Sequence, residues 1–421
     1  MKNIFIILFF IKIIENKIIV LNFNTKQLKF NKEKSYLENY FYNLIYTNFK
    51  IGNPSQKIES FIFFNISFFY IKGNNLKNYK YDQNKSSTFQ EIYETSFLEE
   101  NYNIGIYSED SIKIKDNKNK EININNYNFI LSTELSQNSN DYLPSEIGFN
   151  SVQYGERDKK LNIITTLFER NITKSKIFSF EYESKEKGKI IIGDFPHNYN
   201  KNYNKNSLHF TKAQKRKDKF SWDVLFDDII FLNYKMMNER KIYLSPESNL
   251  IVGSKEFHEI ILNNFFKEKI NKKICFEEKM KNLNYLFYYC NKNFDIKKFD
   301  KIKFISKDLN KTFELDFNDV FDEFEGKIYF KIVFNENKNF DYFILGKPFL
   351  IKYKFVFNAD SNEIGFYNNN LNNKNVFSNF IIFILIIFIL ILIFLIFKYR
   401  KKMKRIIRKY ELNDNYEYFF K

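Results

Sequence analysis

One segment near the C-terminus differs from the rest of the chain because it contains no polar position. All 18 residues of Phe380–Phe397 are Phe, Ile or Leu. At about 1.5 Å per helical residue, a helix of this length reaches roughly the thickness of a bilayer's hydrocarbon core. A helix in a soluble core normally keeps a polar face, which this segment lacks. The pattern therefore predicts a transmembrane helix over residues 380–397, in preference to a buried soluble helix.

The flanks of this segment predict its orientation. Residues 398–421 contain nine basic and three acidic side chains, which gives them a net charge of +6. Residues 368–379, on the other side, are rich in Asn, and Lys374 is their only charge. Because basic flanks stay cytosolic, we expect a single-pass type I membrane protein of the secretory system or cell surface, with a non-cytosolic ectodomain. Residues 368–379 would form a stalk, and residues 398–421 a basic cytosolic tail that contacts anionic lipids.

The N-terminus carries a shorter apolar segment. Lys2 precedes the apolar run Ile4–Ile14, which only Lys12 interrupts. A basic residue followed by a short apolar core is typical of a secretory signal peptide, which we place at residues 1–20. No small-x-small pattern marks a cleavage site. An uncleaved anchor is therefore the alternative, although the run is short for a membrane span.

Between these two segments, short apolar or alternating runs are separated by clusters of Asn, Lys, Gly and Ser. Several runs alternate with period two, which predicts strands. Examples are Lys189–Ile192, Val224–Leu232, Lys301–Ile305 and Lys327–Val333. Helical patterns are fewer, and we expect helices at Leu161–Arg170 and Lys255–Lys267, the second with an N-cap at Ser254. This balance predicts an all-β ectodomain of barrels or sandwiches in two lobes.

Composition changes this picture only modestly. The net charge of the whole chain is +16. The basic tail contributes strongly to that charge, so the ectodomain is only mildly basic and we expect no nucleic-acid partner. Phe, Tyr, Ile, Asn and Lys are used heavily along the whole chain, so a single Phe or Asn is weak evidence of function. The chain has no P-loop, dinucleotide fingerprint or G-x-S-x-G motif, and we expect no cofactor.

The cysteines and histidines give little sign of metal or thiol chemistry. Cys275 and Cys290 are the only two cysteines. In a non-cytosolic compartment we expect them to form a disulfide, which would stabilise the fold by roughly 3 kcal/mol in the chain-entropy model. The three histidines show no ligand spacing, so we expect no metal site. Asn-x-Ser/Thr sequons make four residues candidates for N-glycosylation: Asn65, Asn84, Asn171 and Asn310.

Short motifs follow one another in order along the ectodomain, among them Ile51–Gln56, Ser86–Phe89 and Gly188–Gly193. In this order they resemble the landmarks of the pepsin-like eukaryotic aspartic peptidases. Ile51–Gln56 is similar to the family's I-G-x-P-x-Q strand and turn, and Ser86–Phe89 to the S-S-T-[FY] segment before the flap hairpin. Glu146–Phe149 stands where the family has G-[IL]-L-G-L, in a degraded form. Gly188–Gly193 is similar to a G-x-[IL]-x-[IL]-G strand, and Ser221-Trp222 to the strand that opens the second lobe.

The end of the ectodomain gives the best agreement with the family. In the family, the closing strands have the pattern I-L-G-x-x-F-x-x-x-Y-x-x-x-F, and [IV]-G-[FL] comes a few residues later. The matching residues are Ile344, Leu345, Gly346, Phe349, Tyr353, Phe357, Ile364, Gly365 and Phe366. The resemblance covers about residues 39–367. It implies a bilobal pepsin-like fold, with an N-terminal lobe at 39–205 and a C-terminal lobe at 206–367.

The resemblance also implies a catalytic chemistry that this sequence lacks. Aspartic peptidases cleave amides with two carboxylates about 3 Å apart, which share one proton and act as acid and base. Each carboxylate belongs to a D-[ST]-G loop, yet none of the eleven glycines here has Asp two positions before it. Counting from the landmarks puts Phe63 and Ser245 at the two Asp positions. Glu247 lies two residues beyond the second position, and we interpret it as a solvated surface residue.

These absences favour a membrane-anchored, pepsin-like homologue without catalytic activity. The flap's Tyr-Gly pair falls near Phe97-Leu98, so productive closure over a substrate is not expected. The inter-lobe cleft of a monomer would bind a peptide or protein in extended form, by strand addition against the flap hairpin. The floor of this cleft would be apolar and would contain Phe63, Phe64, Phe68 and Phe69. The alternative, which we favour, is that these side chains only repack a vacated site. The alternatives are an active membrane-bound aspartic-type endopeptidase and a surface or vesicle receptor of unrelated β fold.

Overall fold

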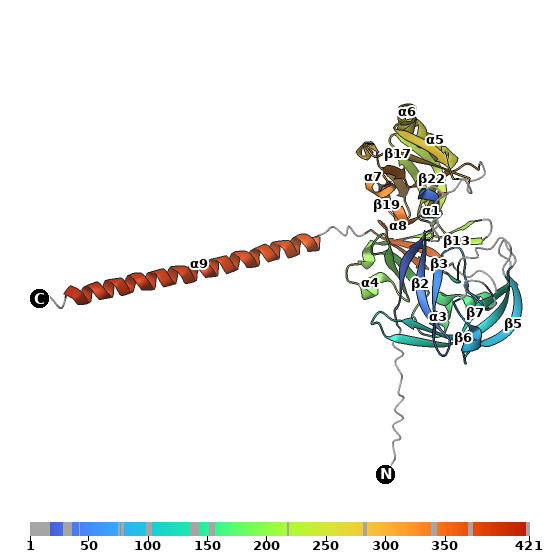
Figure 1. Cartoon of the computed structure of the whole chain (residues 1–421), viewed down its shortest axis with the longest axis horizontal. Coiled ribbons are helices and arrows are strands. Elements are labelled where there is room, and N and C mark those ends of the chain that lie inside the picture. The colour runs from blue at the N-terminus through green and yellow to red at the C-terminus, as the bar shows by residue number, and fades with distance from the viewer. Residues whose placement is uncertain are drawn as a thin grey trace, which may run out of the picture. The chain divides into compact units, whose positions relative to one another are not determined.

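The computed structural model describes residues 17–27, 36–41, 43–74, 76, 80–97, 103–134, 143–150, 156–216, 219–280, 284–337, 343–368 and 374–417. Contacts divide the chain into two compact units, residues 1–368 and 369–421. The first unit contains the β-sheets, and the second contains the long helix α9 (Lys374–Glu417), as Figure 1 shows. Residues 1–16 of the predicted signal peptide lie outside the described residues.

Thirteen strands of the first unit form one continuous sheet. In hydrogen-bonding order they are β11 (Leu208–Lys212), β25 (Glu363–Tyr367), β24 (Phe355–Asn358), β9 (Ile177–Tyr182), β10 (Lys187–Ile192), β1 (Ile19–Gln27), β2 (Asn43–Ile51), β3 (Gln56–Phe63), β8 (Ser145–Gly148), β4 (Phe69–Lys72), β7 (Glu121–Glu134), β6 (Asn103–Lys115) and β5 (Gln90–Phe97). Strand β1 buries Ile19, Leu21 and Phe23 at alternate positions and pairs on both sides. A signal peptide that leaves β1 whole would therefore have to end before Ile19.

A second sheet of twelve strands is built from residues beyond 213. Its main path is β19 (Lys311–Leu315), β18 (Ile302–Ser306), β13 (Lys219–Phe231), β14 (Tyr234–Leu244), β23 (Phe343–Leu345), β15 (Ile251–Gly253), β22 (Ile332–Asn335), β17 (Tyr285–Asn291), β21 (Lys327–Phe330) and β20 (Phe321–Phe324), with β12 (Gln214–Arg216) on β13 and β16 (Cys275–Lys279) on β17. The strand predicted at Lys327–Val333 is divided at Lys331. The mostly β prediction is confirmed by these two sheets.

Short helices connect the strands of the first unit. They are α1 (Tyr36–Phe41), α2 (Glu156–Leu161), α3 (Ile163–Glu169), α4 (Pro196–Tyr199), α5 (Lys255–Ile261), α6 (Lys267–Asn271), α7 (Phe317–Val320) and α8 (Lys347–Leu350), with the 3-10 turns η1 (Gln83–Lys85), η2 (Lys205–Ser207) and η4 (Ile296–Lys298). The predicted N-cap is present, because the Ser254 side chain accepts from the Phe257 N–H at 3.3 Å. The helix predicted at Lys255–Lys267 is confirmed, because α5, the π-helical turn η3 (Leu262–Phe266) and α6 follow one another without leaving the helical backbone conformation.

The two lobes repeat one arrangement of strands around a central crossing. In the first lobe β8 pairs in parallel with β3 and antiparallel with β4, and in the second β23 pairs in parallel with β14 and antiparallel with β15. A glycine is required at each crossing. A Cβ at Gly148 would lie 2.3 Å from the Ile66 carbonyl oxygen, and one at Gly346 would lie 2.3 Å from that of Ser248. The repeat indicates two structurally related lobes.

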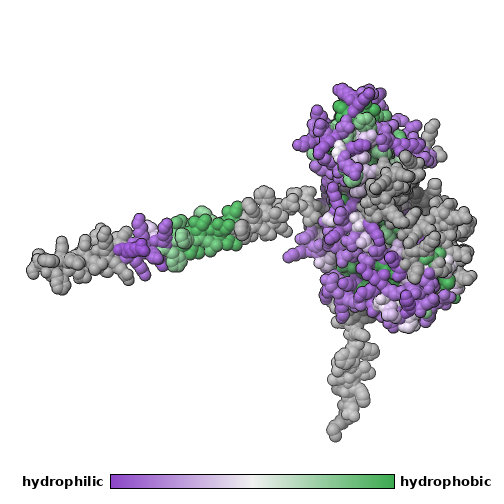
Figure 2. Space-filling model, viewed as in Figure 1, coloured by the Kyte–Doolittle hydropathy of each residue, from purple (hydrophilic) through white to green (hydrophobic). Residues whose placement is uncertain are grey.

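Helix α9, in the second unit, contains the segment predicted to cross a membrane. The side chains of residues 384–397 are apolar and exposed, and basic side chains follow from Lys398, as the colouring of this helix in Figure 2 shows. The side chains of residues 380–383 in the predicted span, and residues 369–373 of the predicted stalk, lie outside those described. Within the described residues, no helix is both long enough and apolar enough to span a bilayer.

Candidate functional site

The loops that follow β3 and β14 occupy equivalent places in the two lobes. Phe63 is paired with Gly148 at the end of the parallel register between β3 and β8. In the other lobe the Ser245 N–H donates to the Leu345 carbonyl oxygen at 3.1 Å, directly before Gly346. The two residues predicted at the catalytic positions therefore stand at corresponding points of the repeat. One is an apolar ring and the other a hydroxyl, so neither provides a carboxylate.

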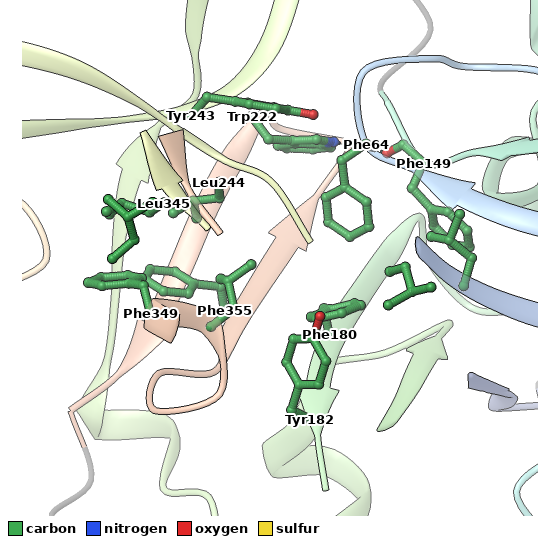
Figure 3. Packing of buried hydrophobic residues seen from close by; sticks show 14 of the residues in the cluster. Phe64, Phe149, Phe180, Tyr182, Trp222, Tyr243, Leu244, Leu345, Phe349 and Phe355 are labelled. Atoms are coloured by element: carbon green, nitrogen blue, oxygen red, sulfur yellow. Dashed lines mark hydrogen bonds between the residues drawn. The ribbon is translucent and has the colours of Figure 1, made fainter. Parts of the chain in front are cut away.

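The first loop places Phe64 in the core. Phe64 is fully buried, and its ring centroid lies between 5.2 and 5.8 Å from those of four rings: Phe149, Phe178, Phe180 and Phe357. Figure 3 shows Phe64 near Phe149 and Phe180. Phe69 is also fully buried, whereas Phe63 and Phe68 are partly exposed. Phe64 and Phe69 are therefore not available as the floor of a cleft. For these two residues the structure supports repacking of the interior.

The second loop partly encloses Glu247 and buries one of its carboxylate oxygens, so the fully solvated position predicted for this residue is wrong. The Tyr243 hydroxyl donates to Glu247 Oε1 at 2.7 Å, and Oε2 is buried without a hydrogen-bond partner. Burial raises the pKa of this carboxyl to about 7. The hydrogen bond from the Tyr243 hydroxyl opposes this rise in pKa. The Ser245 hydroxyl and the Phe64 backbone N–H oppose it more weakly. Sequence spacing alone carried no signal of this burial.

Contacts around these loops join the two lobes. The Phe64 N–H of the first loop approaches the Glu247 carboxylate of the second. Trp222 Nε1 donates to the Phe149 carbonyl oxygen at 2.9 Å, and the Tyr182 hydroxyl donates to the carbonyl oxygen before Glu247 at 3.3 Å. Figure 3 shows Trp222, Phe64 and Phe149 close together in this interior. Glu247 therefore contributes to the contact between the lobes.

This arrangement supplies one carboxyl group where a catalytic dyad needs two. In the loops Phe63–Ile66 and Ser245–Ser248, Glu247 is the single acidic residue. A carboxyl with a pKa of about 7 could exchange a proton near neutral pH. However, neither loop offers the second carboxyl that would share its proton. What Glu247 can do is accept hydrogen bonds when ionised and donate one when protonated.

A hairpin of β5 and β6 stands where the family has its flap. Residues 98–102, between these two strands, lie outside the described residues, and they include Leu98 of the predicted Tyr-Gly position. The base of the hairpin is fixed by Asp110, which is buried. Asp110 accepts hydrogen bonds from the Tyr81 and Thr88 hydroxyls at 2.5 Å each. No sequence motif marks Asp110, because its donors come from a separate segment.

The remaining predicted site residues are distributed over the surface and one hairpin. Cys275 and Cys290 form a disulfide between β16 and β17, which confirms the predicted pair. The four sequon residues all have exposed side chains: Asn65, Asn84, Asn171 and Asn310. In the part of the chain that the structure describes, no group of three or more His, Cys, Asp or Glu side chains is placed to hold a metal ion.

The repeated crossing of strands and the paired loops define a two-lobed β protein. The chain matches the family model for eukaryotic aspartyl protease over residues 46–369. This match covers most of the chain, so the protein belongs to the eukaryotic aspartyl protease family, and the alternative of an unrelated β fold is wrong. No curated protein matches the sequence at a significant level.

Proposed function

We propose that this protein is a membrane-anchored, catalytically inactive member of its family that binds a peptide or protein segment between its lobes. The observation that carries the proposal is the chemistry of the two equivalent loop positions, Phe63 and Ser245. A phenyl ring has no titratable group, and a serine hydroxyl does not ionise near neutral pH. These positions therefore lack the two carboxyl groups that acid–base hydrolysis requires.

Glu247 is a poor substitute for the missing pair. Its Oε1 is occupied by the Tyr243 hydroxyl, and its Oε2 is shielded from solvent. A general base must reach the water that it activates, and a shielded oxygen does not. We therefore assign Glu247 to the packing of the lobes, which leaves the protein without an acid–base pair in these loops.

Strand addition is the mode of binding that we propose. Among the described residues, β5 is the last strand in the order of its sheet, so no described strand pairs with its outer edge. The edge strand also exposes apolar surface, since Ile92 and Tyr93 are 44% and 41% exposed. An extended peptide along β5 would gain main-chain hydrogen bonds and contacts with these side chains. A single copy of the chain suffices for this arrangement, so we propose a monomer.

The membrane anchor in this proposal is residues 380–397, followed by the basic tail 398–421. The disulfide supports a non-cytosolic ectodomain, because such bonds persist in oxidising compartments. Exposure of all four sequon asparagines is also compatible with glycosylation in the secretory pathway. Alkaline extraction of membranes tests the anchor, since an integral protein stays with the lipid whereas a peripheral one is released. Truncation before residue 374 should release the ectodomain.

A peptidase assay tests the inactivity. The full chain, purified in detergent, would be incubated with denatured protein between pH 3 and 6, with and without an inhibitor directed at paired active-site carboxylates. We expect no inhibitor-sensitive cleavage. Cleavage that the inhibitor blocks would overturn the proposal and establish the alternative, an active membrane-bound endopeptidase. A catalytically competent family member assayed in the same detergent provides the positive control.

A further inference from the structure

A row of lysines crosses three neighbouring strands of the first lobe. In the hydrogen-bonded register, Lys50 of β2 lies opposite Lys57 of β3 on one side and opposite Lys113 of β6 on the other. Directly opposite residues point to the same face of a sheet, and neighbouring strands lie roughly 5 Å apart. The three side chains therefore form a regular row across one face of the sheet.

Three more lysines surround this row. Lys115 lies two positions beyond Lys113 on β6, so it points to the same face, and it stands opposite Glu121 of β7. Lys118 and Lys120 are exposed in the turn that joins β6 to β7. Together these residues form what we call the basic face: Lys50, Lys57, Lys113, Lys115, Lys118 and Lys120.

Two carboxylates lie among these lysines, and both are engaged. Glu121 pairs with Lys50 at 2.7 Å and with Lys113 at 4.0 Å. Asp116 is buried and accepts from two backbone N–H groups of the turn at 2.9 and 2.8 Å. Six lysines thus stand beside two carboxylates, whereas the whole chain has 66 basic and 50 acidic residues. The basic face is therefore a local concentration of charge, beyond what the composition of the chain explains.

The row is unfavourable for the stability of the sheet itself. Like charges that stand directly opposite each other on neighbouring strands are destabilising. Glu121 offsets part of this repulsion at Lys50 and Lys113. In the described part of the chain Lys57 forms no ion pair, since Glu59, two positions along β3, pairs with Lys26 at 2.5 Å. A ligand that brings negative charge to the row would relieve the remaining repulsion.

The character of this surface favours a soluble polyanion over a membrane. The side chains of Lys50 and Lys113 are 53% and 33% exposed, so their charges face solvent. Among the described side chains, none of the exposed large apolar residues belongs to β2, β3, β6 or β7. The basic face therefore has no side chain to insert among acyl chains, as a membrane-binding surface usually has. Ammonium groups on flexible stems suit a ligand with repeated anionic groups.

We propose that the basic face binds a sulfated polysaccharide. Successive sulfate groups along the sugar chain would form charge-assisted hydrogen bonds with Lys57, Lys50 and Lys113, and the remaining three lysines would attract the flanking sulfates. The row holds no aromatic side chain on which bases would stack, which disfavours single-stranded nucleic acid. The choice of a polysaccharide rests on the non-cytosolic location proposed above, whereas the charge of the face does not.

Acetylation of individual lysines, followed by mass spectrometry, tests the face residue by residue. The full chain in non-ionic detergent would be labelled with a heparin octasaccharide or with neutral dextran present. We expect heparin to slow the labelling of Lys50, Lys57 and Lys113 by about fivefold and to lose this effect in high salt, which screens exposed charges. The reaction should be unchanged at three exposed lysines that pair with carboxylates elsewhere: Lys212, Lys272 and Lys301.

This measurement separates the basic face from the basic C-terminal tail, because each lysine reports its own protection. Heparin bound to residues 398–421 would protect the tail and leave Lys57 unchanged. Equal protection of the row and of the three paired lysines, or no protection of the row, would overturn the proposal.

A triple variant separates the row from net charge. In Lys50→Gln with Lys57→Gln and Lys113→Gln, the heparin concentration for half-protection of Lys115 should rise by about tenfold, because three ion pairs are lost. The same exchange at the three paired lysines removes an equal charge and should leave that concentration unchanged. An equal rise in both variants would show that overall charge alone attracts heparin. Since the row repels itself, the thermal midpoint of Lys57→Gln should be no lower than that of the native chain.

Three further probes decide the occupant of the basic face. Heparin stripped of its sulfates, vesicles of phosphatidylcholine with phosphatidylserine, and a single-stranded DNA oligonucleotide would be compared at equal negative charge. We expect each to protect the row more weakly than heparin does. Stronger protection by any of them would make the sulfated polysaccharide the wrong occupant. Release of the protein by alkaline extraction, in contrast, would contradict the proposed anchor and leave heparin binding by the purified chain unchanged.

Discussion

The crossing loops of the two lobes share a backbone arrangement and differ in their chemistry. The loop after β3 places Phe64 in an aromatic core, whereas the loop after β14 encloses the polar group of Glu247. Both nevertheless keep a glycine at the crossing strand, Gly148 in one lobe and Gly346 in the other. The comparison shows that packing requires a glycine at each crossing, whether the adjoining loop is apolar or polar.

The largest effect should come from breaking that shared frame. Alanine at Gly148 would place its Cβ 2.3 Å from a backbone oxygen, and alanine at Gly346 would do the same. Backbone atoms cannot move aside as a flexible side chain can, so we expect each variant to lose on the order of 5 kcal/mol or not to fold. Denaturant unfolding of the purified chain would measure the loss.

Gly326 provides the control for these substitutions. A Cβ there would meet nothing within 4 Å, although the residue has a φ of +71°. Asn tolerates this left-handed backbone better than most residues, so Gly326→Asn should change stability by about 1 kcal/mol or less. A Gly148→Ala variant as stable as Gly326→Asn would show that the crossing does not need its glycine.

The next effect distinguishes two neighbouring residues within the first loop. Phe64→Ala removes a ring that packs against four others, so we expect a loss of about 3–5 kcal/mol. Phe63 is partly exposed, and Phe63→Ala should cost clearly less. Thermal and denaturant unfolding of both variants would test this order. Equal losses would mean that the ring of Phe63 also packs in the interior.

Much of the frame could be predicted from the sequence because its signals are local. Gly148 ends one short apolar strand and Gly346 follows another, and the order and spacing of these strands resemble the family's. Ser254 marks a helix start by its position before a periodic run. The π-helical turn η3 inside the following helix was not predicted, since the same run of apolar residues also fits a regular α-helix. Local patterns define which elements exist better than where they are interrupted.

The chemistry between the lobes was much less predictable, because it depends on distant partners. Glu247 is enclosed by groups that include the Phe64 N–H, which lies about 180 residues earlier in the chain. Lys331 and Lys347 look like ordinary surface lysines in the sequence, and only the crossing strands make them interior. Spacing along the chain carries no record of such burial, so both features required the tertiary structure.

A third prediction sharpens the comparison through the pH dependence of stability. Burial raises the pKa of Glu247 from 4.5 to about 7, so between these values the folded chain holds this proton more tightly than the unfolded chain. The contribution of this group to stability is therefore lost as the pH rises from 4.5 to 7, by an amount on the order of 3 kcal/mol. Glu247→Gln should remove that slope and be the more stable form at neutral pH.

Denaturant unfolding of both forms at several pH values between 4 and 8 would measure the difference. Glu121→Gln is a suitable control, because surface lysines lower the pKa of that exposed carboxyl and the sign of its contribution is opposite. If the native chain and Glu247→Gln show parallel pH profiles, the carboxyl is not buried in the way described here.

The smallest expected effect is on peptidase activity. It tests whether the two loops can catalyse hydrolysis once each carries an Asp. Phe63→Asp with Ser245→Asp restores two carboxyl groups at equivalent points of the repeat, yet we expect no measurable inhibitor-sensitive cleavage between pH 3 and 6. The family needs glycine two residues beyond each Asp for a close backbone approach. Here those positions hold Asn65 and Glu247, and the Glu247 carboxyl would compete for the shared proton.

The informative contrast is with a variant that also carries Asn65→Gly and Glu247→Gly. If Phe63→Asp with Ser245→Asp cleaved substrate without the added glycines, the backbone of both loops would already suit catalysis. The side chains of Phe63 and Ser245 would then be the sole reason for inactivity. If cleavage appears only when the glycines are added, the second residues of each loop hold the backbone away from the reactive geometry. Because Glu247 contacts the first loop, we expect its replacement to matter more than that of Asn65. The two loops would then differ in how far each has departed from catalysis, with the second further from it than the first.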